Sequence, residues 1–134
     1  MHTIRLPRGR RRRGAAALEF ALVLPLLLVL VLGAIDWGYY FFVEQVVVNA
    51  AREGARVGTL QSNATLADAL DNAQVACNFF ITQAGLNSSL ATCTPTTGPG
   101  PSIVVTASYT TGSLTGFTNA IVPTRAFARA EMRN

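Results

Sequence analysis

Residues 15–35, AAALEFALVLPLLLVLVLGAI, form the longest apolar stretch of this 134-residue chain, and Glu19 is its one charged member. A helix of about 20 such residues spans the roughly 30 Å hydrocarbon core of a bilayer. A secretory signal peptide is the alternative to a transmembrane helix, but its apolar region is only about 7–15 residues long and ends at a small-x-small site. Residues 31–34, Val-Leu-Gly-Ala, match such a site poorly. The stretch is therefore predicted to be a transmembrane helix.

The charge distribution predicts the orientation of this helix. All eleven basic residues are arginine, and six of them precede Gly14 without an acidic neighbour. Arginines beside a transmembrane helix mark its cytoplasmic end, so the residues after 35 are expected outside the cytoplasm. Beyond Gly14, five arginines face seven acids, a side-chain charge of −2. A nucleic-acid-binding protein needs a persistent basic face, so nucleic acid is not expected as a partner.

The apolar helix is predicted to continue beyond the membrane, through residues 36–58. Aromatic residues follow the apolar stretch directly, as is typical of the outer membrane–water interface. Further along, small residues recur every four positions, which places them on one helix face and lets another element approach closely. The aromatic residues are Trp37, Tyr39, Tyr40, Phe41 and Phe42, and the small ones are Ala50, Gly54 and Gly58, with Ala51 and Ala55 beside them.

A second helix is predicted over residues 66–84. Thr65-x-x-Asp68 resembles a capping box, with Asp in place of the usual Glu or Gln. Apolar residues then follow at spacings of three and four, and Gly85 is a natural stop. This amphipathic helix is expected to lay its apolar stripe on the small residues of the first helix.

The C-terminal part alternates between loop and strand patterns. Residues 87–101 are rich in Ser, Thr, Gly and Pro and are predicted to be a loop. Residues 103–109 and 125–133 alternate between apolar and polar, which predicts two strands. Two strands are marginal alone and need a helix to pack on. The connection between them is expected to fold back over the sheet through Leu114, Phe117 and Ile121.

Together these elements predict an α+β protein, in which a long transmembrane helix and a second amphipathic helix pack on a small antiparallel sheet. The domain organisation follows: a basic leader over residues 1–14, the transmembrane and extended helix over 15–58, and a small extracytoplasmic α+β domain over 59–134. Pro25 lies inside the first helix, where it removes one hydrogen bond and is expected to kink the backbone.

The residue inventory argues against catalysis. His2 is the one histidine, and two cysteines cannot supply the ligands of an ordinary zinc site. No set of nucleophile, base and orienting group is present either, so no enzyme activity, metal or cofactor is expected. Outside the cytoplasm, Cys77 and Cys93 most simply form a disulfide, and two free buried thiols are the alternative.

Glu19 places a carboxylate within the apolar stretch, where a charge is energetically unfavourable. A charged side chain at the centre of a transmembrane helix costs on the order of 2.5–3.5 kcal/mol, and less near its end, where Glu19 lies. One alternative is that Glu19 reaches the headgroups and has no further role. The other is that a partner charge compensates it.

The residues around Glu19 carry a resemblance that favours the second alternative. Four arginines, Gly14, Ala15 and then Glu19-Phe20 at the start of an apolar helix are similar to the processing site of type IV prepilins. The resemblance implies that a prepilin peptidase cuts between Gly14 and Ala15. It also implies that Glu19 neutralises the N-terminal amine of a neighbouring subunit during assembly, in a low dielectric where pairing matters most.

A second motif narrows the resemblance. Ala51-Arg52-x-Gly54-Ala55-Arg56 is similar to the Ala-Arg-x-Gly-Ala-Arg signature of TadE-like pseudopilins, which belong to tight-adherence (Flp-type) pilus systems. The resemblance implies a minor pilin-like subunit of the bacterial inner membrane, in a system used for surface adhesion. It implies other pilin or pseudopilin subunits and the pilus assembly platform as partners. An unprocessed single-pass anchor that presents a binding domain is the alternative.

Overall fold

The computed structural model describes residues 10–60, 65–118 and 120–133. Two helices, α1 (Arg10–Thr59) and α2 (Leu66–Gln83), precede the short 3₁₀ helix η1 (Ser88–Leu90) and three strands. The strands are β1 (Ala91–Thr97), β2 (Ser102–Thr110) and β3 (Arg125–Arg133), which form one antiparallel sheet in that order. The predicted α+β arrangement is confirmed.

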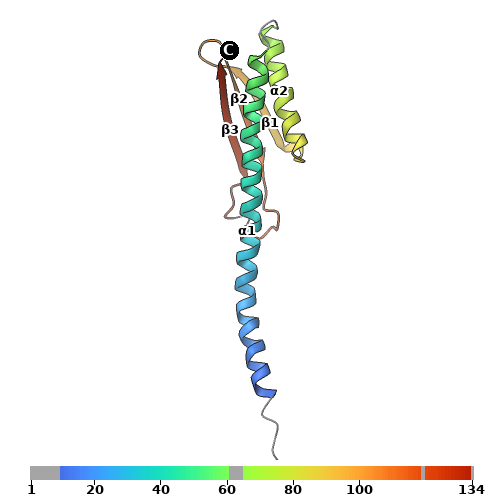
Figure 1. Ribbon diagram of the computed structural model, residues 1–134, viewed down its shortest axis with the longest axis vertical. Coiled ribbons are helices and arrows are strands. Elements are labelled where there is room, and N and C mark those ends of the chain that lie inside the picture. Colours follow the sequence, from blue (N-terminus) through green and yellow to red (C-terminus); the bar gives the residue numbers. More distant parts are fainter. Residues whose placement is uncertain (1–9, 61–64, 119, 134) are drawn as a thin grey trace, which may run out of the picture.

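Helix α1 is a single rod of 50 residues, about 75 Å long at 1.5 Å per residue. Pro25 lies inside it without ending it. Figure 1 shows that its N-terminal half projects alone, while its C-terminal half packs beside α2 and the sheet. Residues 14–31 are all exposed, whereas a buried stripe begins at Asp36 and continues through Val43 and Val47 to Gly58. Residues 14–31 therefore form a bare apolar stem, whereas α1 from Asp36 onward is part of the core.

Helix α2 begins with the predicted capping box. The Asp68 amide donates to the Thr65 hydroxyl at 3.2 Å, and the Thr65 amide donates back to the Asp68 carboxylate at 3.2 Å. The helix ends just before Gly85, whose φ of 80° is the left-handed conformation that favours glycine. Its buried face consists of Ala69, Ala73, Cys77 and Ile81.

The two helices meet closely at the small residues of α1. A Cβ atom on Gly54 would lie 2.8 Å from the carbonyl oxygen of Ala73, and one on Gly58 would lie 3.1 Å from the Ala73 Cβ. A larger side chain at Gly54 would push α2 away, because it would meet the backbone of Ala73. At Gly58 the nearest atom is the Cδ1 of Ile103 on the sheet, at 2.9 Å, with α2 next. The prediction that α2 packs on the small-residue face of α1 is confirmed.

The sheet has one more strand than the sequence predicted. Residues 87–101 were expected to be loop, yet β1 occupies part of this segment and pairs with β2 in the register Pro95↔Val105. Proline fits there because β1 is an edge strand, whose outward side needs no hydrogen-bond donor. Threonines fill alternate positions of β1 and favour the extended backbone.

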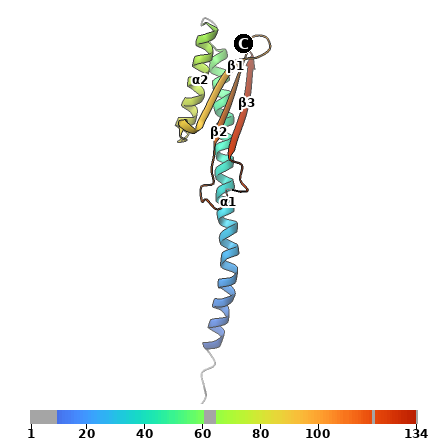
Figure 2. The same cartoon turned by 180° about the vertical axis from the view of Figure 1, so that it is seen from behind.

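The connection between β2 and β3 does not fold over the sheet, contrary to the prediction. Figures 1 and 2 show it descending below the sheet along α1, toward the apolar half of that helix. Hydrogen bonds to a carboxylate on α1 hold it there, as described below. The three apolar side chains that were expected to cover the sheet, Leu114, Phe117 and Ile121, are exposed.

Candidate functional site

The predicted processing and assembly residues lie near the beginning of α1. Gly14, Ala15, Glu19 and Phe20 are all exposed, and no atom of another element lies within 4 Å of where a Gly14 Cβ would be. The helix starts at Arg10, so it runs through the Gly14–Ala15 junction. Residues 1–9 of the predicted leader lie outside the described residues. Cleavage at Gly14 and charge pairing at Glu19 stay predictions.

The stem of α1 has an apolar surface on every side. Its large hydrophobic side chains from Leu18 to Val31 are all exposed. Within the described part of the chain, α1 is the one helix long and apolar enough to cross a membrane. A helix that is hydrophobic all round is stable only inside a core or a bilayer, or against other helices. Among the described residues no other element covers the stem, so its apolar surface is open to lipid or to other helices.

The Ala51–Arg56 motif divides its residues between two faces of α1. Ala51 and Ala55 are fully buried and Gly54 touches α2, whereas Arg52 and Arg56 are exposed. Arg56 pairs with Glu53 at 2.5 Å on the surface, and the hydrogen bond from Arg56 lowers the pKa of Glu53. The small residues of the motif therefore serve helix packing, while the arginines face outward.

The predicted disulfide is present. Cys77 on α2 and Cys93 on β1 are bonded, with their Cα atoms 6.2 Å apart, and both are buried. The bond joins the second helix to the edge strand across the intervening turn and η1. Such a bond is typical of proteins outside the reducing cytoplasm, which agrees with an extracytoplasmic domain.

A feature that the sequence prediction missed is a carboxylate cradle at the base of the domain. Asp36 follows the apolar stretch directly and is 1% exposed. Its carboxylate accepts hydrogen bonds from the hydroxyls of Ser113, Thr115 and Thr118 at 2.5–2.7 Å. The backbone amide of Thr115 donates a fourth at 2.9 Å. The cradle ties the β2–β3 connection to the point where α1 leaves the folded domain.

These bonds also decide the charge state of Asp36. Burial raises the pKa of this carboxyl, but the hydrogen bonds from Ser113, Thr115 and Thr118 together outweigh burial and hold the pKa well below its ordinary value. Asp36 is therefore ionised at neutral pH. The sequence gives one signal for this site: Asp36 stands directly between Ile35 and Trp37, where a buried charge without hydrogen-bond partners would be costly.

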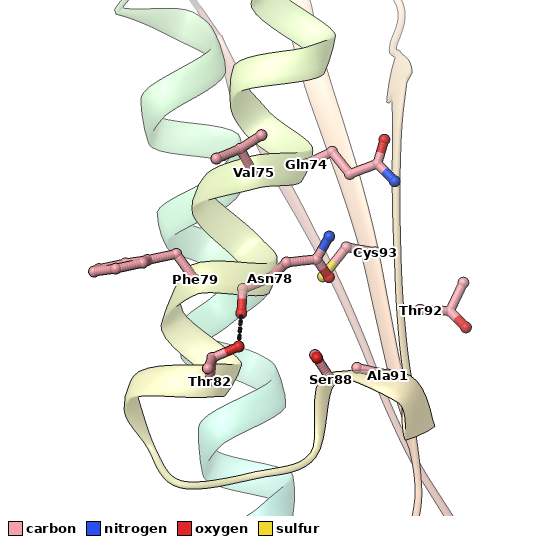
Figure 3. Close-up of a pocket in the computed structure, with 9 residues that line it drawn as sticks. All are labelled: Gln74, Val75, Asn78, Phe79, Thr82, Ser88, Ala91, Thr92 and Cys93. Carbon is pink, nitrogen blue, oxygen red and sulfur yellow. Dashed lines mark hydrogen bonds between the residues drawn. The ribbon is translucent and has the colours of Figure 1, made fainter.

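A shallow groove lies between α2 and the edge strand β1, with a volume of about 600 Å³. Figure 3 shows Gln74 and Asn78 of α2 pointing toward β1 and Cys93, while Thr92 and Phe79 point away from the groove. The lining residues are uncharged, so the groove offers no acid or base for catalysis. No group of three metal-ligating side chains is present among residues 14–60, 65–118 and 120–133.

One comparison with known proteins gives a match. The family model described as TadE-like protein matches residues 14–56, which include Gly14, the whole apolar stretch and the Ala51–Arg56 motif. No curated protein and no solved structure matches the chain. The matched segment is the bare stem together with the part of α1 that packs against α2. Over residues 14–56, the long helix of this chain is similar to that of TadE-like proteins.

Proposed function

We propose that this protein is a minor pilin-like subunit of a tight-adherence pilus, anchored in the bacterial inner membrane by the stem of α1. The observation that carries the proposal is the bare apolar stem, which projects from a disulfide-bonded domain and lies within the segment matched by the TadE-like family. A stem of this kind can be embedded in lipid before assembly and against other stems afterwards. The folded domain then stays outside the cytoplasm.

Processing by a prepilin peptidase is the second part of the proposal. The enzyme would cut between Gly14 and Ala15 and remove the leader, residues 1–14. Gly14 is exposed, and a Cβ atom on it would meet nothing within 4 Å beyond the backbone of its own helix, which supports access to this site. The mature chain would then comprise the helix over residues 15–58 and the extracytoplasmic domain over residues 59–134.

Glu19 would form the contact between subunits. In the mature chain, Glu19 lies four residues after the new amine of Ala15, which is about 6 Å, or one helical turn, along the axis. Two parallel stems offset by about one turn would place Glu19 of one subunit beside the amine of the next. Opposite charges attract strongly in a low-dielectric surrounding, so the pair would favour this offset. Other pilins, pseudopilins and the assembly platform are the proposed partners, and surface adhesion is the proposed role.

The test of this contact is co-purification of the full chain with pilus components after co-expression of the pilus system. Glu19→Ala removes the charge but leaves the stem more apolar, so insertion into the membrane fraction should be equal or better. Recruitment should fall, because each incoming amine would be unpaired in an apolar assembly. Glu19→Gln should lie between the two. Normal recruitment of Glu19→Ala would favour the alternative, a single-pass anchor that does not assemble.

A further inference from the structure

The β2–β3 connection, residues 111–118 and 120–124, buries polar side chains and exposes three large apolar ones. The side chains that bond Asp36 are turned toward α1. Three of its four large apolar side chains face outward: Leu114 is 64% exposed, Phe117 57% and Ile121 71%, whereas Val122 is buried. Several large apolar side chains exposed on one loop are informative, because large exposed apolar patches are typical of surfaces that contact a membrane or another protein.

The Asp36 cradle fixes where this loop lies along α1. Asp36 is the residue after the apolar stretch 15–35, so the loop is held at the level where that stretch ends. Leu32 and Gly33 are half-buried, unlike the other residues of 14–35, all of which are exposed. The folded domain thus begins to cover α1 about one helical turn before Asp36. The apolar side chains of the loop therefore lie beside the end of the stem.

Two further features at this level point to lipid. The segment 111–124 contains no charged residue, so no charge in it opposes entry into the interfacial layer. Trp37, Tyr40 and Phe41 form an aromatic cluster on α1 just past Asp36, with ring centroids 5.7–6.1 Å apart. Tryptophan and tyrosine gather at membrane–water interfaces. The helix and the loop thus present the same kind of surface at one height.

We propose that the β2–β3 connection is an interfacial loop, which buries Leu114, Phe117 and Ile121 in the outer leaflet around the point where α1 leaves the bilayer. The inference rests on the proposed insertion of the α1 stem in a membrane. The loop acts as a second membrane contact and sets the height of the extracytoplasmic domain above the lipid. Asp36 is its positioning residue, because its carboxylate holds the loop on the helix.

The test measures fluorescence quenching by brominated acyl chains, with the full chain in phosphatidylcholine vesicles at a low protein-to-lipid ratio. Trp37 is first replaced by Phe, which removes the natural signal. Phe117→Trp then reports on the loop, and Ile121→Trp is an independent second reporter. Leu26→Trp reports on the middle of the stem. Phe79→Trp on α2 is the matched control, because Phe79 is 62% exposed and Phe117 is 57% exposed.

We expect the brominated lipid to reduce the emission of the loop reporters strongly and that of Leu26→Trp as well, while Phe79→Trp keeps its emission. If Leu26→Trp is quenched but both loop reporters behave like Phe79→Trp, the interfacial loop is wrong and the membrane stem stands. Blue-shifted but unquenched loop reporters would mean that protein covers the loop, which also overturns the inference. An unquenched Leu26→Trp would refute the stem and the loop together.

Discussion

The carboxylate of Asp36 and the hydroxyl of Thr118 are hydrogen-bonded at 2.5 Å across 82 residues of sequence. This contact closes the base of the folded domain, since it joins α1 to the connection between the last two strands. Three further donors from the same connection complete the cradle. Hydrogen bonds within the chain thus stabilise the charge of Asp36, whereas Glu19 is an exposed acid on the stem.

Acid should weaken the cradle. The folded-state pKa of Asp36 lies below its ordinary value of 3.8, so the ionised carboxylate contributes stability above pH 3.8 and loses it progressively as the pH falls below that value. Asp36→Asn should lower the melting temperature at neutral pH and flatten its fall in acid. Thermal unfolding of the detergent-solubilised chain between pH 2 and pH 7 measures both effects. Asp71→Asn, at an exposed acid of α2, is the control. An equal acid-induced fall in Asp36→Asn would contradict the assignment.

The contact of Gly54 with α2 predicts an unusual response to alanine. Alanine normally stabilises a helix by up to about 1 kcal/mol relative to glycine, and Gly38→Ala should show this gain because nothing lies within 4 Å of the new methyl group. Gly54→Ala should instead destabilise the domain by about 1–3 kcal/mol, because its Cβ would meet the Ala73 carbonyl oxygen. Denaturant unfolding of both variants gives the comparison. A stabilised Gly54→Ala would show that the helices are not in close contact there.

The disulfide should account for a large part of the stability of the extracytoplasmic domain. In the chain-entropy model, closing a loop of about 15 residues is worth roughly 3 kcal/mol, and the two cysteines are 16 positions apart. The double variant Cys77→Ala/Cys93→Ala should lose about that amount while it still inserts in the membrane fraction. Reductant should destabilise the wild-type chain and leave the double variant unchanged. Alkylation of both cysteines in the exported, folded chain would refute the bond.

The parts of the fold that depend on local pattern could be predicted from the sequence. The apolar stretch, the capping box at Thr65 and Asp68, and the spacing of small residues near Gly54 all act over a few residues along a helix. The disulfide was predictable because the chain has only two cysteines. The alternation of apolar and polar residues likewise placed β2 and β3 near their true bounds.

The features that the sequence did not predict depend on distant neighbours. Strand β1 contains Pro95 and many threonines, so its composition resembles a loop until its place at the sheet edge is known. The cradle was missed because Asp36 meets Ser113 across 77 residues. Because that contact could not be predicted, the β2–β3 connection was expected to fold over the sheet. Its apolar side chains Leu114, Phe117 and Ile121 were therefore assigned to a core that they do not enter.

Whether this chain is a processed pilin-like subunit is tested most directly by the intact mass of the protein recovered from membranes after co-expression with a prepilin peptidase. Gly14→Val is the matched variant, because it alters the residue before the proposed cut and should leave the precursor whole. We expect the wild-type mass to correspond to a chain that begins at Ala15, and the variant mass to one that keeps residues 1–14. A wild-type chain that still begins at Met1, or one that begins after Ala34, would contradict the proposal.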